Sequence, residues 1–367
     1  MKRVYFVLAT FFLVISCRNT QTSQLMNISV DINQKVTLSL SLITEEITAI
    51  ELELSDESIT SPERVEQVLF FDNNLIIVES RKILVFDMNG NFIRTIGSKG
   101  QGPREYYDIR NMTIDEKNGG VYVVDSNSKI LCYDLNGNYL KGITQFQQDE
   151  FSIIDLKYIN DDLLLVVEQW KPKANGVCKH SAILKLNDEL QITDSCMIRD
   201  DASEKWNRVY HSYDNYLFYG NSTIYLYYPD LYAVDTNPAE TVLRDTLYRF
   251  EKNQLIPELK LKFNESGIED NKNIYLFNIY RSSGYVFAVY YNKKNNTTYR
   301  FIYDTDTGKG YNVLNGEFTD DMNQIEEQVK IRPVTMNTEL FYYLHTHMKP
   351  DDIEEPNPTL YIGKLKK

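Results

Sequence analysis

The sequence predicts an all-β protein, namely a six-bladed β-propeller of four-stranded antiparallel blades. Three observations carry this prediction: an internal repeat, short β-rich runs along most of the chain, and few helix signals. At roughly 47 residues per repeat, the 367 residues leave room for about six units. Repeats of this length, made of short strands, are typical of propellers.

The repeat is clearest in the first half of the chain. Residues 82–96 (KILVFDMNGNFIRTI) align without gaps to residues 129–143 (KILCYDLNGNYLKGI), and eight of the fifteen positions are identical. Each copy holds two β-rich runs around an Asn-Gly pair, at Asn89-Gly90 and Asn136-Gly137. Asn-Gly favours a two-residue hairpin turn in which both central residues have positive φ. Each repeat is therefore predicted to form three or four antiparallel strands.

Weaker copies follow downstream, and we expect a short helix only at residues 319–330, with Thr319 as its cap. The further β-rich runs are residues 182–187 (with 163–167 as the inner strand), 246–250 (after 224–228), 299–304 (after 285–291), and finally 341–344 and 359–362.

Residues 36–42 and 47–54 are also β-rich and precede the first repeat. We expect one of these runs to pair with the last blade near Leu360, because an open ring would leave long unpaired strand edges. The alternative is a separate β-hairpin that forms a lid.

The N-terminus predicts export and lipidation. A basic start (residues 1–3) precedes an uncharged apolar run at residues 4–15. That run is shorter than the roughly 20 residues that span a bilayer, so residues 1–16 form a signal peptide. The run ends in Val-Ile-Ser before Cys17, which resembles a bacterial lipobox and makes Cys17 the lipidation site. The alternative is a secreted protein with an incidental cysteine.

These assignments divide the chain into a signal peptide (1–16), a lipidated cysteine with a polar tether (17–26) and a propeller (27–367). We expect a lipid-anchored protein of the cell envelope, on the periplasmic or the outer-membrane face. The formal net charge is −13, and loss of Lys2 and Arg3 would make it −15, with 37 basic against 52 acidic residues. Such an acidic chain is a poor partner for nucleic acid. Its hydrophobic content of 43% excludes a disordered protein.

Three cysteines remain after Cys17, so at most one disulfide can form. Cys178 and Cys196 are closer in sequence than either is to Cys132. We expect buried, unreactive thiols, with a disulfide between Cys178 and Cys196 as the alternative.

Residues 28–143 contain a more specific pattern. Residues 97–106 (GSKGQGPREY) fit G-x-x-G-x-G-P-x-E-Y at every fixed position, and they follow residues 50–53 (IELE), 85–87 (VFD) and 90–97 (GNFIRTIG). In these features the chain resembles the six-bladed β-propeller lipoproteins of Bacteroidetes, which are similar in shape to NHL-repeat propellers. The resemblance implies a propeller on a lipid tether and specifies little chemistry.

The Gly-rich loop supplies the candidate ligand-binding residues Arg104, Glu105 and Tyr106, and the β-rich run before it supplies Arg94. Such a loop would join the outer strand of one blade to the inner strand of the next and present these side chains at the channel mouth. The alternative is structural: Glu105 accepts backbone N–H bonds and Tyr106 packs between blades.

Candidate metal ligands are sparse. His345 and His347 have the one metal-like spacing among four histidines, because residues i and i+2 of a strand share a face. Zinc would bind there, and zinc-dependent amidating lyases are relatives of the NHL propellers. Calcium could bind at Asp320-Asp321, with a solvated acidic turn as the alternative. We predict no cofactor as the default.

No nucleophile elbow, H-E-x-x-H motif or Asp box is present in the sequence. Tyrosine pairs within strands fill the core or offer a stacking surface. The leading hypothesis is a non-enzymatic binding or scaffolding module for a peptide, glycan or protein partner. The alternatives are a propeller enzyme, either a metal-dependent lyase or a glycan-active enzyme with its site at the central channel, and a purely structural envelope component.

Overall fold

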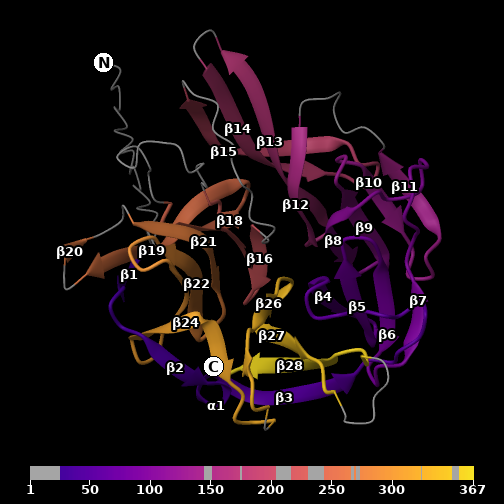
Figure 1. Cartoon of the computed structure of the whole chain (residues 1–367). Helices are drawn as coiled ribbons and strands as arrows, with labels where there is room; N and C mark the ends of the chain where they lie inside the picture. Colours follow the sequence, from indigo (N-terminus) through magenta and orange to yellow (C-terminus); the bar gives the residue numbers. More distant parts are fainter. Residues whose placement is uncertain are drawn as a thin grey trace, which may run out of the picture.

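The computed structural model describes residues 25–143, 151–173, 176–203, 216–229, 244–265, 268–269, 273–323, 325–348 and 355–367. Its strands form six sheets arranged as blades in a ring (Figure 1). The predicted six-bladed β-propeller of four-stranded antiparallel blades is therefore confirmed. The signal peptide, Cys17, His211 and the Asp351-Asp352 pair lie outside the described residues.

The blades follow one another along the chain, each running from its inner strand outward. Residues 163–167, expected as an inner strand, lie in the second strand of their blade. Blade 1 is β4 (Val65–Phe71), β5 (Asn74–Glu79), β6 (Ile83–Asp87) and β7 (Phe92–Thr95); blade 2 is β8 (Ile109–Asp115), β9 (Gly120–Asp125), β10 (Ile130–Tyr133) and β11 (Tyr139–Ile143); blade 3 is β12 (Phe151–Ile159), β13 (Asp162–Lys173), β14 (Gly176–Leu186) and β15 (Ile192–Ser203).

The second half of the ring is built in the same way, with short additions. Blade 4 is β16 (Leu217–Gly220), β17 (Thr223–Leu226), β18 (Thr246–Glu251) and β19 (Gln254–Glu265), with β20 (Ile268–Glu269) beside β19; blade 5 is β21 (Ile274–Arg281), β22 (Tyr285–Asn292), β23 (Thr297–Asp304) and β24 (Lys309–Thr319), with β25 (Gln328–Val329) beside β24; blade 6 is β26 (Arg332–Val334), β27 (Asn337–His345) and β28 (Thr359–Leu365), completed by β3 (Thr44–Glu51).

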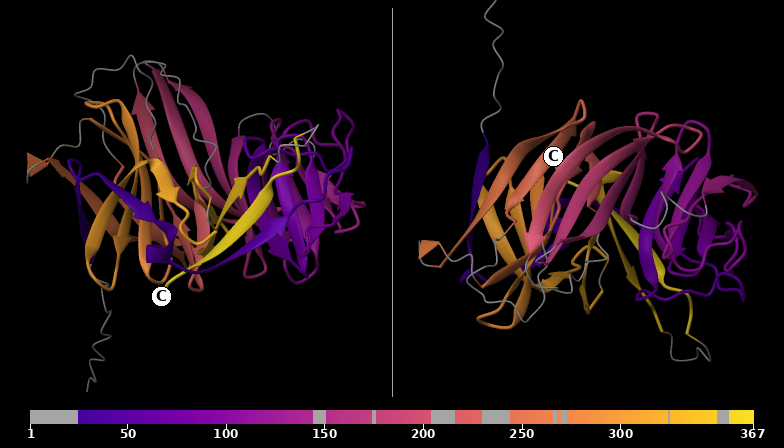
Figure 2. Two further views of the ribbon diagram at one scale, coloured as in Figure 1. Left: turned by 60° about the horizontal axis from the view of Figure 1, so that its bottom comes forward. Right: turned by 90° about the horizontal axis from the view of Figure 1, so that it is seen from above.

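The ring is closed by the N-terminal segment. β3 pairs antiparallel with β28 and places Ile50 opposite Leu360, which confirms the predicted closure. Two further strands were not predicted to join blades: β1 (Met26–Asp31) adds in parallel to β19, and β2 (Val36–Ser39) adds in parallel to β24. A single helical turn, α1 (Leu40–Ile43), leads from β2 to β3 and lies beside the C-terminus, where Lys366 N–H donates to the Ile43 carbonyl (Figure 2).

Strand direction gives the ring two unlike faces. On the face that we call the short-turn face, strands within a blade are joined by two to five residues. Four of these turns are pairs with positive φ at both residues, as in type I′ hairpins: 72–73, 160–161, 221–222 and 252–253. The opposite face, which we call the long-connection face, carries connections of thirteen residues such as 52–64, 96–108 and 346–358.

The Asn-Gly turns differ from expectation. Gly90 and Gly137 have φ of 87° and 85°, whereas neither preceding Asn has positive φ. In the first turn the Asp87 carboxylate accepts N–H bonds from Asn89 (2.8 Å) and Asn91 (2.9 Å). The aspartate thereby stabilises a wider turn with a register shift in place of the two-residue type.

The helix expected at residues 319–330 is also wrong. Thr319 ends β24, and the next residues form a turn before β25. The Asp320 carboxylate accepts the backbone N–H groups of Met322 (3.1 Å) and Asn323 (3.0 Å). An aspartate that bonds its own backbone in this way competes with helix formation.

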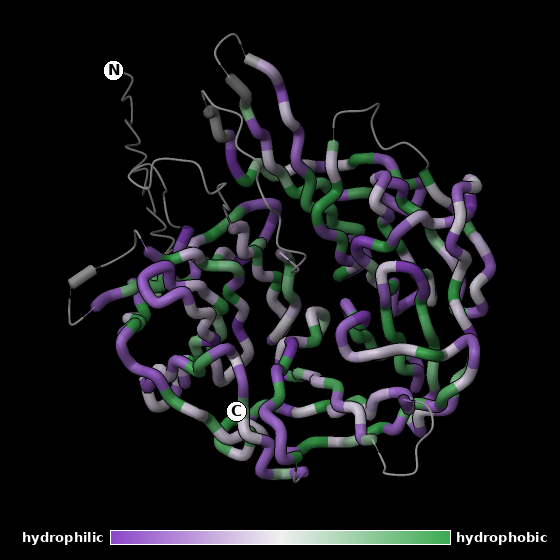
Figure 3. Tube along the Cα trace, in the orientation of Figure 1, coloured by the Kyte–Doolittle hydropathy of each residue, from purple (hydrophilic) through white to green (hydrophobic). Residues whose placement is uncertain are grey.

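Buried apolar side chains of neighbouring blades form shared clusters. Hydrophobic residues, green in Figure 3, recur along the strands of the ring. Tyrosines contribute much of this core: Tyr290 stacks on Tyr299 at 5.3 Å and Tyr343 on Tyr361 at 4.7 Å between ring centroids. Within the described part of the chain, no helix is long and apolar enough to cross a membrane.

The three described cysteines are free thiols, with Cys132 and Cys178 buried. Cys196 lies opposite Ile183 in the β14–β15 ladder, five residues from Cys178. Five residues of strand measure roughly 16 Å, which excludes the alternative disulfide in this structure.

Candidate functional site

The axis of the propeller is lined by buried polar side chains. Four inner strands shift register by one residue, and in each a polar residue follows the extra one. These residues are Gln67, Asn111, Asp155 and Asn278, each at most 8% exposed. A β-bulge redirects side chains, and here it turns one polar group per strand into the ring interior.

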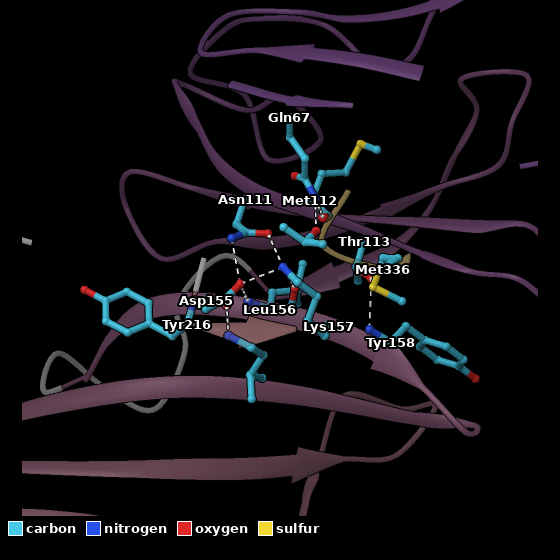
Figure 4. A network of polar contacts seen from close by, with 12 residues as sticks. Gln67, Asn111, Met112, Thr113, Asp155, Leu156, Lys157, Tyr158, Tyr216 and Met336 are labelled. Carbon is cyan, nitrogen blue, oxygen red and sulfur yellow. Dashed lines mark hydrogen bonds and ion pairs between the residues drawn. The ribbon is translucent and has the colours of Figure 1, made fainter. Parts of the chain in front are cut away.

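Asp155 is the hub of this polar ring (Figure 4). It is fully buried and forms an ion pair with Lys157, which is also fully buried. Burial lowers the pKa of Lys157, while the Asp155 charge opposes that shift. The carboxylate accepts five hydrogen bonds, from Asn111 Nδ2 (2.7 Å), Leu156 N–H (2.7 Å), Lys157 Nζ (2.9 Å), Tyr216 N–H (2.7 Å) and Leu217 N–H (2.7 Å).

The donors to Asp155 come from β8, from β12 and from the start of β16, so one carboxylate joins blades 2, 3 and 4 at the axis. All of its hydrogen-bonding capacity is used within the protein. We therefore assign Asp155 and Lys157 a structural role.

The Gly-rich connection 96–108 is held by contacts of its own glutamate and of Lys129. Glu105 Oε2 accepts the Gly102 N–H at 2.9 Å, and Lys129 Nζ donates to the carbonyls of Gly102 (3.2 Å) and Glu105. A Cβ atom at Gly100 would lie 1.9 Å from Glu105 Oε2. The glycines thus leave room for the carboxylate that pins the loop.

The four predicted ligand-binding residues do not form one site. Tyr106 is 1% exposed, and its hydroxyl donates to the Ile96 carbonyl at 3.1 Å. Arg104 lies over the ring of Tyr139, 5.4 Å from its centroid. Arg94 Nη1 donates to the Leu135 carbonyl (3.4 Å) and to Asn136, in a turn of the short-turn face. The contacts of Glu105 and Tyr106 match the structural alternative.

A shallow pocket of about 620 Å³ lies against this loop. Besides the loop glycines and Pro103, it is lined by Gln101, Tyr107, Asn127 and Lys129. Tyr107 is 42% exposed. Sequence reasoning missed these lining residues, although Gln101 and Tyr107 lie within or beside the motif.

The histidine pair lies at the long-connection end of blade 6. The rings of His345 and His347 are 4.6 Å apart, and His347 Nε2 is 2.6 Å from the Tyr361 hydroxyl. Burial and the neighbouring His347 lower the pKa of His345, while Glu327, whose carboxylate is 3.8 Å away, opposes this. Among the described residues, no three His, Cys, Asp or Glu side chains are close enough to share a metal ion.

Asp320 and Asp321 bond to separate groups of the protein. Asp320 is 2% exposed and accepts the Tyr343 hydroxyl besides the two N–H groups of its turn. Asp321 accepts the Ser41 N–H at 3.0 Å. The pair therefore does not converge on a calcium ion.

The architecture defines the chain as a six-bladed β-propeller. The chain belongs to the family described as "Domain of unknown function (DUF4934)", whose model matches residues 24–367. A crystal structure of a protein from Bacteroides fragilis NCTC 9343, named a putative exported protein, is similar in fold: TM-score 0.64, 16% identity, covering 94% of this chain and 100% of that one. The WD40 domain of Neurospora crassa Pan2 matches with TM-score 0.35 and 14% identity over 83% of this chain and 76% of that one. Among curated proteins, none is significantly similar.

Replacing Asp155 by Asn should destabilise the propeller by about 3–5 kcal/mol, because the buried Lys157 ammonium loses its counter-charge. The measurement is urea unfolding monitored by tyrosine fluorescence. The double variant Asp155→Asn/Lys157→Met should recover part of this loss. A single variant as stable as the native protein would contradict the assigned role.

Gly100→Ala should cost about 1–2 kcal/mol, because the new methyl group displaces the Glu105 carboxylate from the Gly102 N–H. In a Glu105→Ala background the same substitution should cost much less, which a double-mutant cycle measures. Equal costs in both backgrounds would show that Gly100 is needed for a different reason.

Proposed function

We propose that this protein is a non-enzymatic binding or scaffolding module of the cell envelope, which holds a peptide, glycan or protein partner on its long-connection face. The carrying observation is the asymmetry of the two faces: the turns of the short-turn face have two to five residues, whereas the other face carries thirteen-residue connections besides short turns such as 80–82 and 126–129. Binding residues are disproportionately found on such connections, which a rigid scaffold positions.

Exposed apolar side chains offer candidate contacts on this face. Leu54, Ile59, Tyr107, Met322 and Met348 lie on its connections, and Trp170 lies near the end of β13 that points toward it. They are six of the twelve exposed large apolar residues in the described part of the chain, and such residues can contribute to interaction sites.

The N-terminus supports an orientation as well. β1 runs in parallel with β19, from Met26 beside Leu259 toward the long-connection face. The chain therefore enters β1 from the side of the short-turn face. A lipid on Cys17, joined through the polar tether, would place the short-turn face toward the membrane and leave the opposite face open to a partner. The name of the Bacteroides fragilis protein, which has the same fold, agrees with export.

The partner test compares matched substitutions on the two faces. The full chain is expressed in a Bacteroides host, and partners are recovered by cross-linking and affinity purification. Tyr107→Ala and Met348→Ala should reduce recovery of a specific partner several-fold. Met88→Ala and Leu140→Ala should not, although these residues are similarly exposed, at 42% for Tyr107 and Met88, 59% for Met348 and 54% for Leu140. Equal losses for both pairs would contradict the proposal.

Anchoring is tested by Cys17→Ser. The native protein should sediment with membranes and incorporate labelled palmitate, because two or more acyl chains give stable anchoring. The variant should lose the label and leave the membrane fraction. An unlabelled native protein would contradict lipidation at Cys17.

A further inference from the structure

Three acidic residues lie next to one another along the backbone where blade 1 meets blade 2 on the long-connection face. Glu66 is the extra residue at the register shift of β4, and Glu79 ends β5 opposite Val65. Asp108 immediately precedes β8, whose first N–H, at Ile109, donates to the Ser80 carbonyl at 2.6 Å. That bond places Asp108 beside the residue that follows Glu79. We call Glu66, Glu79 and Asp108 the carboxylate cluster.

Glu79 is the unusual member of the cluster. The residue is only 5% exposed, and its Oε1 has no hydrogen-bond partner. A buried acceptor without a donor costs about 1–3 kcal/mol, and a charged one costs more. Asp108 Oδ1 is likewise buried without a hydrogen bond.

Arg81 and Lys99 pair with Asp108, and the charge of Lys82 acts on Glu79, but no cation among the described residues donates a hydrogen bond to Glu79 Oε1 or Asp108 Oδ1. Lys82 Nζ donates to the carbonyls of Glu57 (3.4 Å) and Ile59, and Arg332 Nη1 donates to the Val65 carbonyl. Arg81 and Lys99 each lie 3.7 Å from Asp108 Oδ1, beyond hydrogen-bond distance. The cluster therefore retains two buried acceptor oxygens that the protein does not supply with donors.

We propose that the carboxylate cluster binds the guanidinium group of an arginine in an extended peptide segment of the partner. This inference rests on the proposed binding function and names the chemistry that the long-connection face recognises. A guanidinium carries five N–H donors in a rigid fork, so it can satisfy separate acceptors on Glu79 and Asp108 together. A single metal ion fits less well, because within the described residues no three such side chains converge on one point.

The same geometry makes binding depend on pH. Burial of the carboxyl group, together with the charges of Asp108 and Glu79, raises the pKa of Glu66 to about 7, although the residue as a whole is exposed and Arg332 opposes the shift. The charged groups that face Glu66 are Glu79 at the end of β5, Asp108 before β8 and Arg332 at the start of β26. A bound cation favours ionised Glu66, so peptide binding should release a proton and strengthen as pH rises through 7.

The test uses the full chain purified in detergent and three capped tripeptides: acetyl-Gly-Arg-Gly-amide, its lysine analogue and its citrulline analogue. Binding is measured by calorimetry and ligand-observed NMR at pH 5.5 and pH 8. The arginine peptide should bind about tenfold more tightly at pH 8, and more tightly than the lysine peptide. The citrulline peptide, which has the same shape without the charge, should not bind.

Glu79→Gln and Asp108→Asn should each weaken arginine-peptide binding at least tenfold at pH 8. Glu189→Gln, which alters an exposed carboxylate in a turn of the short-turn face, should leave it unchanged. Thermal unfolding of each variant checks that it folds.

Several results would overturn the inference: citrulline or lysine binding as tight as arginine, no loss in Glu79→Gln, or displacement of the peptide by millimolar calcium chloride. The proposed function has its own outcome. If the arginine peptide fails to bind while partner recovery still depends on Tyr107 and Met348, the guanidinium site is wrong and the binding function stands. If substitutions on neither face change partner recovery, the proposed binding function is wrong.

Discussion

The pairing of β3 with β28 is the constraint on which the rest of this structure depends. It joins residues more than 300 positions apart and supplies the outer strand of blade 6. A propeller without this seam would expose an unpaired edge and lose the packing of blade 6 against blade 1. The entropy of closing such a long loop grows slowly with its length, so one ladder of strand pairs can hold the whole ring.

Closure also determines how the N-terminal segment is used. Before reaching β3, the chain passes along the rim and adds β1 to blade 4 and β2 to blade 5. Three blades therefore depend on residues 26–51. Within this segment β1 runs toward the long-connection face, in the same direction as β19.

Sequence reasoning predicted the blades and the closing strand, because each leaves a local signal: a repeat, or an apolar run near a terminus. For the Gly-rich loop it proposed ligand-binding residues, and the contacts of Glu105 and Tyr106 match the structural alternative. It missed what depends on distant partners. Nothing local to Asp155 shows that its donors come from β8 and β16. Nothing local to β1 or β2 shows that they pair in parallel with β19 and β24. The turns at Asp87 and Asp320 were misjudged because side-chain bonds to the backbone outweighed the dipeptide and helix patterns.

Two buried carboxylates of this fold differ in how many hydrogen bonds they accept. Asp155 receives five hydrogen bonds at the axis, whereas Glu79 Oε1 receives none at the junction of blades 1 and 2. Both lie on inner or second strands of well-packed blades, so packing alone does not explain the difference. Folding selects for donors around a buried charge, because an unsatisfied one costs stability. Glu79 retains this unfavourable free energy beside Glu66 and Asp108, on the long-connection face. A donor that arrives with a ligand explains this best.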